Sequence, residues 1–337
     1  MNDQNQIGKD STSSRRGRGC LLRLGASLAS LLGLMLVGYI FEPPTEAADA
    51  KTYPPPGELV DVGGHRLHIK CTGNGSPAVV IEAGLGDWST SWGFVQAEVA
   101  KTTRVCTYDR AGMGWSEAGP LPRDAAQFAK ELYTLLQNAN VPGPYVMVGH
   151  SLGGLGVRVF VHDYSSEVSG VVLIESMNPK QLPQSPTGVR SQPNPQSRYY
   201  SVLTGLARFG VVRVLARPVT RMSSSSIIPD EKAYYSRFVR VQSMQAAMGE
   251  SQGLPASGEE AAAVKTFGDL PLIVLTGRLH TDPPNWQTWQ TELLQLSSNS
   301  QQLFAEKSEH NIQIEEPDAA VAAIIQMVEQ VRQTVRK

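Results

Sequence analysis

The pentapeptide Gly149-His150-Ser151-Leu152-Gly153 constrains the fold of this chain more than any other feature. An apolar run, Tyr145–Val148, leads directly into it, and a helix-forming segment follows. Such a turn crowds the backbone around its central serine, so the two flanking positions need glycine, which has almost no side chain. The pattern therefore predicts a strand, a sharp bend that lifts the Ser151 hydroxyl clear of a sheet, and then a helix.

Strand-like and helix-like segments alternate on both sides of this turn. Short apolar runs typical of buried strands lie at 77–84, 103–108, 168–176 and 270–277, and apolar residues recur at helical spacing in 125–141 and 317–337. The alternation predicts a mostly parallel sheet with helices on both faces. A two-strand hairpin that turns at Gly63-Gly64 precedes it.

One interval, from Met177 to about Gly268, breaks the alternation. It is rich in Ser, Pro and Gln, and it contains three helix-like stretches near 197–216, 229–249 and 258–266. At about 90 residues, it is far longer than an ordinary connection between two strands. We interpret it as an inserted helical cap, with a partly disordered insertion as the alternative.

An uncharged apolar stretch near the amino end, Leu24–Phe41, is long enough to cross a membrane. As a helix, its 18 residues reach about 27 Å, roughly one hydrocarbon core. The basic residues before it predict that the amino end faces the cytoplasm: Lys9, Arg15, Arg16 and Arg18. We expect residues 1–41 to anchor an extracytoplasmic catalytic part by a single span. A signal peptide cleaved near Ala48-Asp49-Ala50, which would give a secreted or periplasmic protein, and a buried core helix are the alternatives.

The segment 42–57 contains five prolines and disfavours both helix and central strand. It predicts a linker, with the folded domain at 58–337. A formal net charge of -1 gives no indication of a nucleic-acid partner, which usually leaves a basic patch. Three cysteines are too few for a disulfide framework that defines the fold.

Three segments together resemble the α/β-hydrolase superfamily, in its esterase-like branch. In chain order they are YDRAGMGWSE, YVMVGHSLGGLGVRVF and SEHNIQIEEPDAAVAAI. The resemblance covers residues 58–337 and implies the α/β-hydrolase fold, with the cap inserted at about 177–268. It also implies a serine hydrolase whose nucleophile is Ser151, and it argues against the members that carry aspartate at that turn.

A serine hydroxyl becomes a good nucleophile only when a base takes its proton. The resemblance assigns this role to His310, which lies in a polar loop between the last expected strand and the final helix. A histidine there also follows the serine in the chain order typical of the fold. His280, after the seventh strand, is a weaker rival.

The acid that orients the histidine is less strongly specified. In most members of the superfamily it lies after the seventh strand, where this chain has Asp282. Other members carry it after the sixth strand, where this chain has Glu175. We expect Asp282 to complete a Ser-His-Asp triad, with Glu175 as the alternative.

An oxyanion hole needs two backbone donors aimed at the developing negative charge. The amide of Leu152 follows the nucleophile, and the amide of Leu85 lies in a glycine-rich loop after the strand at 78–82. We expect these two donors, although Ala83 replaces the histidine that is common in the superfamily at this loop. Trp88 and Trp286 are candidates for lining the substrate pocket, although packing alone also explains them.

The resemblance makes the strands that carry Cys71 and Cys106 neighbours. In an oxidising compartment the two thiols would form a disulfide; two buried free thiols are the equal alternative.

The sequence thus predicts a carboxylic-ester hydrolase that acts through an acyl-enzyme on a small or acyl-chain substrate, with no metal or organic cofactor. Acyl transfer, or hydrolysis of a thioester, amide or carbon–carbon bond, uses the same triad and remains an alternative. A non-catalytic ligand-binding protein with this fold is the alternative from another class. The sequence does not specify the substrate, the acyl chain length or the oligomeric state.

Overall fold

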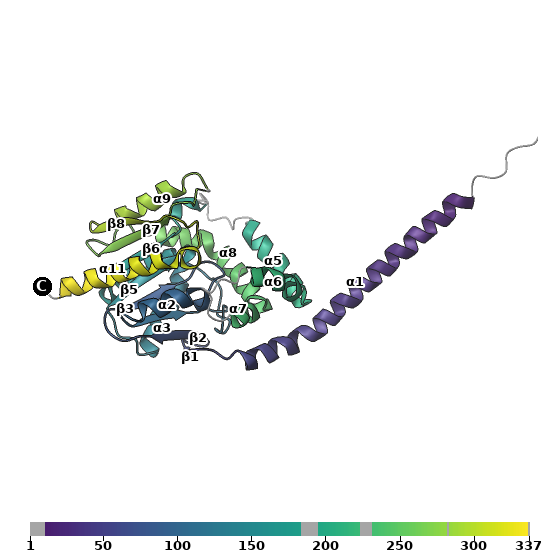
Figure 1. Cartoon of the computed structure of the whole chain (residues 1–337), viewed down its shortest axis with the longest axis horizontal. Coiled ribbons are helices and arrows are strands. Elements are labelled where there is room, and N and C mark those ends of the chain that lie inside the picture. The colour runs from purple at the N-terminus through teal and green to yellow at the C-terminus, as the bar shows by residue number, and fades with distance from the viewer. Residues whose placement is uncertain (1–10, 183–194, 223–230, 282, 336–337) are drawn as a thin grey trace, which may run out of the picture.

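A single eight-stranded sheet forms the centre of the molecule (Figure 1). It is seen in a computed structural model, which describes residues 11–182, 195–222, 231–281 and 283–335. The strands are β1 (Glu58–Asp61), β2 (Arg66–Thr72), β3 (Ala78–Glu82), β4 (Val105–Tyr108), β5 (Tyr145–His150), β6 (Val168–Ile174), β7 (Leu272–Gly277) and β8 (Ser300–Ala305). Their order across the sheet is β1-β2-β4-β3-β5-β6-β7-β8. Only the β1–β2 and β2–β4 pairs are antiparallel, which confirms the mostly parallel sheet.

Helices cover both faces of this sheet. The helices of the described residues, of which only some pack on the sheet, are α1 (Ser11–Thr52), α2 (Gly93–Val99), α3 (Ala125–Asn138), α4 (Leu152–Asp163), α5 (Pro195–Arg208), α6 (Val211–Met222), α7 (Glu231–Phe238), α8 (Val241–Ala263), α9 (Trp286–Glu292), α10 (Ile312–Glu315) and α11 (Pro317–Val335). One apolar core forms where α3 and α4 pack on the sheet, and a second forms beneath α2 and α11. Every residue of β3, β4, β5 and β7 is buried, as expected for strands covered on both faces.

The β2–β4 pair at the antiparallel end of the sheet carries the disulfide. Cys71 and Cys106 face each other in the register of the pair, and their sulfur atoms are 2.00 Å apart. The structure therefore has the bonded form rather than two free thiols.

The interval between β6 and β7 contains α5, α6, α7 and α8. These helices form the cap, in four segments rather than the three that the sequence indicated. The longest, α8, packs against α3 and α4 and so joins the cap to the core. A side chain in place of Gly253 would lie only 2.0 Å from the backbone oxygen of Arg123, so the helix approaches the core backbone closely.

Helix α1 continues beyond the apolar stretch, through Pro43 and Pro44, and ends at Thr52. We expected a non-helical linker from residue 42, and the structure differs, because only residues 53–57 lack regular structure between α1 and β1. The reason is tertiary: Arg213 of α6 donates to the carboxylates of Glu42 and Asp49 at 2.7 Å each. These ion pairs hold the last turns of α1 against the cap and outweigh the local preference of proline.

Among the described residues, one helix has the length and composition to cross a membrane. It is the part of α1 from Leu24 to Thr52, which includes a window of mean hydropathy 2.0 with no buried residue. Figure 1 shows α1 running away from the sheet as a long isolated helix, with α5 and α6 near its domain end.

Candidate active site

The carboxyl ends of the central parallel strands meet at one edge of the sheet, and the candidate site lies there. β3 leads into the loop at 83–88, β5 into Ser151, and β6 into Glu175. The loops after β7 and β8 carry His280 and His310. Binding sites in parallel sheets are typically found at this edge.

Ser151 occupies the sharp bend between β5 and α4. Its backbone has φ 50° and ψ −121°, a conformation that is costly for a residue other than glycine. A side chain at Gly149 would come within 2.8 Å of the Gly154 backbone, and one at Gly153 within 2.5 Å of the Ala83 oxygen. The two glycines therefore allow the bend, as the sequence predicted, and the bend places Ser151 at the edge of a cavity.

His310 lies in the loop between β8 and α10, and its Nε2 atom is 3.1 Å from the Ser151 hydroxyl oxygen. The loop is held by Glu315, whose carboxylate accepts hydrogen bonds from the Ser308 hydroxyl and the Glu309 amide. The structure thus brings together the two residues that the sequence selected as nucleophile and base.

Glu175 lies directly after β6, with φ 45° and no solvent exposure. Its Oε2 atom is 3.3 Å from Nδ1 of His310. Since a carboxylate only accepts, Nδ1 carries the proton, and Nε2 is left free to accept from Ser151. Burial alone would raise the pKa of Glu175, but hydrogen bonds from His280, His310 and the Gly277 amide outweigh burial and hold it below its usual range. The side chain is therefore ionised at neutral pH.

Asp282, the acid expected from the sequence, lies outside the described residues. In the same loop, Nδ1 of His280 is 2.5 Å from Oε2 of Glu175, the oxygen that also faces His310. The Gln287 amide group holds this loop by donating to the backbone oxygens of Gly277 and His280. Glu175 thus lies between two histidines.

His150, next to the nucleophile, does not approach the serine as a base. Its Nε2 atom donates to the backbone oxygen of His310 at 3.0 Å, and its ring packs edge-on against Trp92. Burial, with a smaller effect of the neighbouring His310, lowers the pKa of His150 to about 3. A neutral His150 therefore fixes the backbone of the candidate base.

The loop after β3 packs directly on the elbow. A side chain at Gly84 would lie 3.3 Å from Cβ of Ser151 and 2.8 Å from Nδ1 of His150, so glycine is required there. Leu85, a predicted oxyanion donor, lines the same cavity as Ser151. Leu152, the other predicted donor, is the first residue of α4, where backbone amides have no acceptor within the helix. Both amides are thus carried by segments that meet at Ser151.

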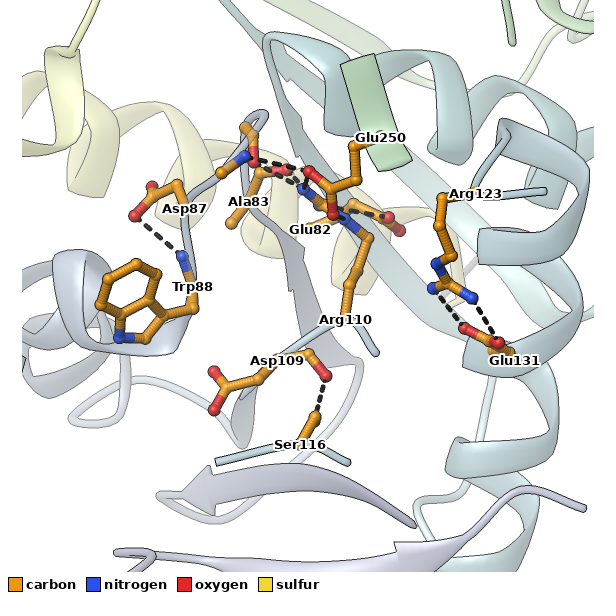
Figure 2. A network of polar contacts seen from close by, with 12 residues as sticks. Glu82, Ala83, Asp87, Trp88, Asp109, Arg110, Ser116, Arg123, Glu131 and Glu250 are labelled. Atoms are coloured by element: carbon orange, nitrogen blue, oxygen red, sulfur yellow. Dashed lines mark hydrogen bonds and ion pairs between the residues drawn. The ribbon is translucent and has the colours of Figure 1, made fainter. Parts of the chain in front are cut away.

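A buried ion pair supports this loop from beneath (Figure 2). The Arg110 guanidinium donates to the backbone oxygens of Ala83 and Gly84, at 2.6 Å each, and to the Glu250 carboxylate at 2.7 Å. Glu250, on cap helix α8, also accepts from the Gly86 amide at 3.0 Å. The cap therefore contacts the candidate oxyanion loop through one carboxylate.

A second acid, Glu82, lies 3.7 Å from Arg110 and is completely buried. Burial raises the pKa of Glu82 to about 7, although the charge of Arg110 acts in the opposite direction. Arg110 therefore draws most of its compensating charge from Glu250.

A cavity of about 670 Å³ opens at the nucleophile. Its walls come from the core and the cap and include Ser151, His310, His280, Trp286, Tyr234 and Gln196. Trp286 lines the cavity, as expected, and its ring packs 5.4 Å from that of His310. Trp88 is 1 % exposed and stacks on the Tyr234 ring of α7, which agrees with the packing role that the sequence also allowed.

One group of side chains at the site has the composition of a metal site. Ligand atoms of Glu175, His280 and His310 all lie within 4.8 Å of one another. The same atoms form the hydrogen bonds that orient His310, so an ion bound there would compete with the serine–histidine arrangement.

Several of these residues had no signal in the sequence. Glu250 and Arg110 are separated by 140 positions, and only the folded cap brings them together. The sequence indicates His280 only as a rival base. Its contact with Glu175 depends on how the loop after β7 bends, which the sequence does not specify.

Comparison with known proteins supports the assignment of the fold. The model of the family described as alpha/beta hydrolase fold matches residues 77–317. A Bacillus subtilis protein, YqjL, is 26 % identical over 265 residues, which cover 77 % of this chain and 86 % of that protein.

Among solved structures, an esterase from Thermogutta terrifontis superposes with a TM-score of 0.59 at 18 % identity. That match covers 81 % of this chain and 97 % of the esterase chain. At this identity the likeness concerns the fold.

One stronger local match involves a much longer protein. The probable transporter efuK of Hormonema carpetanum is 35 % identical over 136 residues, which are 38 % of this chain but only 20 % of the transporter. The chain therefore spans about a fifth of that relative. Because the family model matches well over half of the chain and the eight-stranded sheet carries a serine at its elbow, the chain belongs to the family of proteins with the alpha/beta hydrolase fold.

Proposed function

We propose that the protein is a membrane-anchored serine hydrolase that cleaves carboxylic esters through an acyl-enzyme. The observation that carries this proposal is the continuous chain of contacts from Ser151 to His310 to Glu175, at 3.1 Å and 3.3 Å, beside an open cavity. Spacing of this kind is required of a nucleophile, its base and the group that orients the base.

The reaction follows from these positions. The Ser151 oxygen attacks the ester carbonyl carbon while Nε2 of His310 takes the hydroxyl proton, and the Leu85 and Leu152 amides stabilise the negative oxygen. Collapse of this intermediate breaks the bond to the alcohol oxygen, which receives the proton from His310. Water then attacks the acyl-enzyme and gives a proton to His310. The bond from the acyl carbon to the Ser151 oxygen breaks, His310 returns the proton to that oxygen, and the carboxylic acid leaves.

We assign the acid of the triad to Glu175. Its side chain is buried, ionised and aimed at Nδ1 of His310. It also has a positive φ, as does Ser151, and backbone strain of this kind concentrates at functional sites. Asp282 remains the alternative until both positions are substituted.

The proposed anchor is the apolar part of α1, with the basic residues before it in the cytoplasm. Apolar side chains from Leu24 to Phe41 are exposed in the structure; Leu34, for example, is 70 % exposed. A helix with this exposure and a mean hydropathy of 2.0 is more stable in lipid than in water. The catalytic domain then lies outside the cytoplasm, where the Cys71–Cys106 disulfide persists.

A fluorophosphonate probe tests the nucleophile directly. Full-length protein in detergent should be labelled, and Ser151→Ala should abolish labelling while near-ultraviolet circular dichroism stays unchanged. A folded wild type that resists the probe would favour the ligand-binding alternative. Product analysis with and without an added alcohol acceptor then separates hydrolysis from acyl transfer.

A further inference from the structure

The α5–α6 hairpin of the cap, residues 195–222, is the part of the catalytic domain that lies nearest to the proposed membrane span. We propose that this hairpin docks on the lipid surface and that the active site takes its ester from the bilayer. The inference rests on the proposed membrane anchor and on the proposed ester hydrolysis. It adds an interaction surface and a class of substrate.

Contacts between α1 and the hairpin fix the position of the cap. The Tyr39 ring lies 6.1 Å from that of Phe209, at the corner between α5 and α6. Gly38 approaches the same corner so closely that any side chain there would collide with the Phe209 backbone oxygen. One turn further along α1, Glu42 forms its ion pair with Arg213. These contacts hold the corner rigidly against the helix.

The position of these contacts along α1 sets the depth of the hairpin. Gly38 and Tyr39 belong to the last turn of the uncharged stretch, which ends at Phe41. With a rise of about 1.5 Å per residue, Tyr39 lies about 3 Å from that end, and therefore at the expected boundary between hydrocarbon and headgroups. Phe209, which contacts Tyr39, lies at the same level. Figure 1 shows α5 and α6 on the side of the domain from which α1 departs, with α11 and its sheet face further away.

The hairpin presents apolar side chains to solvent. On α5, Tyr199 is 59 % and Val202 is 62 % exposed; on α6, Val214 is 70 % and Leu215 is 65 % exposed. Clusters of exposed apolar residues mark interaction sites with protein or lipid. Here the neighbouring surface is the exposed apolar part of α1 itself, so a lipid surface covers both without a further partner.

The charge of the hairpin fits the same occupant. Residues 195–222 contain five arginines and no aspartate or glutamate, although the whole chain has a net charge of -1. Arg213 is paired with Glu42 and Asp49, so the other four carry the charge that could meet lipid. Apolar residues interspersed with arginine are typical of helices that lie at the surface of membranes with anionic lipids. This composition favours lipid over a second copy of the same cationic hairpin.

The hairpin is also continuous with the catalytic cavity. Gln196, in the first turn of α5, lines that cavity together with Ser151. Tyr200 follows one turn later on α5. Its hydroxyl oxygen would lie 3.0 Å from a Cβ atom added at Gly86, so this part of α5 also approaches the loop after β3. A hairpin seated on lipid therefore places the mouth of the cavity at the membrane surface, where an acyl chain can enter without crossing water.

Depth-dependent quenching tests the docking in the full chain. In a Cys20→Ser background, Leu215→Cys carries a bimane probe in vesicles of phosphatidylcholine and phosphatidylglycerol with brominated acyl chains. We expect at least a roughly twofold loss of fluorescence, because docked apolar faces lie about 5–10 Å into the interface. A probe at Leu121→Cys is the control. Leu121 is also an exposed leucine, but it lies in a loop outside the hairpin, so this probe should stay unquenched. A probe at Leu32→Cys, within the span, should be strongly quenched.

Docking of the hairpin and anchoring by α1 give different patterns of quenching. Quenching at Leu32 without quenching at Leu215 would retain the anchor and overturn the docking. Loss of quenching at both positions would overturn both. Cross-linking between two copies through Leu215→Cys, without lipid quenching, would assign the surface to an interface between copies and also overturn the inference.

A second measurement tests the source of the substrate. Leu215→Glu places a charge where the docked hairpin meets lipid, so it should lower hydrolysis of a long-chain ester in vesicles by roughly tenfold. The rate with a water-soluble short-chain ester should not change. An equal fall in both rates would show that the substitution damages the cap rather than its docking. If neither ester is hydrolysed by wild-type protein that binds and is quenched normally, the proposed function fails and the docking stands.

Discussion

The carboxyl edge of the sheet and the α5–α6 hairpin border the same cavity, but they are built in opposite ways. At the sheet edge, Ser151 and Glu175 are buried, hold costly backbone conformations, and are surrounded by close hydrogen bonds. In the hairpin, the described side chains include few buried residues (Ser197, Thr204, Ala207 and Val212) and several exposed apolar ones.

This difference separates two tasks. Preorganised donors and acceptors are needed where charge develops, so the sheet edge must be rigid. A surface that contacts lipid needs exposed apolar side chains and only moderate internal packing. Helix α8 lies between the two regions: it packs on α5, and its Glu250 contacts Arg110 and Gly86. The cap therefore also contributes to the rigidity of the oxyanion loop.

The largest effect is expected from Glu175→Gln. The variant keeps the shape of the side chain but removes the charge that orients and stabilises protonated His310, so kcat should fall by about 10³–10⁴-fold. Steady-state kinetics with a soluble ester measures this. Asp282→Asn is the matched control and should change kcat by less than about threefold. The reverse result would transfer the role of the acid to Asp282 and leave Glu175 as a structural carboxylate.

Glu250→Gln tests whether the cap supports catalysis. The amide keeps one hydrogen bond to Arg110 or Gly86, but it leaves the buried guanidinium without its main counter-charge. We expect a loss of about 3 kcal/mol in the free energy of unfolding and a roughly tenfold lower kcat, since the oxyanion loop loosens.

Glu260→Gln is the control for this variant, because Glu260 lies on the same helix and accepts only from the amino end of α3. It should leave kcat unchanged. An unchanged kcat in Glu250→Gln as well would restrict the role of the ion pair to stability.

The fold could be predicted from the sequence because its signals are local. Buried parallel strands leave continuous apolar runs, and the glycines around Ser151 mark a bend that few folds contain. The end of α1 could not be predicted in this way. Pro43 and Pro44 disfavour a helix locally, and the ion pairs of Glu42 and Asp49 with Arg213 exist only after the cap has folded.

The residues of the candidate site also differ in how far local sequence signals specify them. Ser151 and His310 were selected from motifs that surround them, and the structure places their side chains in contact. The choice between Glu175 and Asp282 depends on how two neighbouring loops bend at the sheet edge, which one sequence does not specify. Glu175 has a positive φ and its carboxylate faces His310. No glycine or other residue type next to it in the sequence indicates that backbone conformation.

A smaller effect is expected from His280→Ala. In the wild type, His280 and His310 both donate to Oε2 of Glu175. Removal of one donor leaves more of the carboxylate charge to stabilise protonated His310. The acid limb of the kcat/KM profile should therefore move to higher pH by up to about one unit, the value of one hydrogen bond to a charged group. His162→Ala, an exposed histidine on α4, should not move it. A shift to lower pH would show that His280 supports the acid rather than competes for it.

At His150 the expected effect concerns stability rather than rate, and it is specific to the sheet edge. Burial holds the pKa of His150 at about 3 in the folded protein, below the value of 6.5 for an exposed histidine. Between these values the unfolded chain binds a proton that the folded protein does not, so this contribution to stability is complete above pH 6.5 and is lost as pH falls toward 3. One such group changes the free energy of unfolding by up to about 1.4 kcal/mol per pH unit.

His150→Gln, whose amide can still donate to the His310 oxygen, should be less stable at neutral pH but lose less stability on acidification. Urea unfolding at several pH values between about 4 and 7 measures the two slopes. Parallel slopes would mean that His150 takes up a proton in the folded state, and the sheet edge would then be less rigid than its hydrogen bonds indicate.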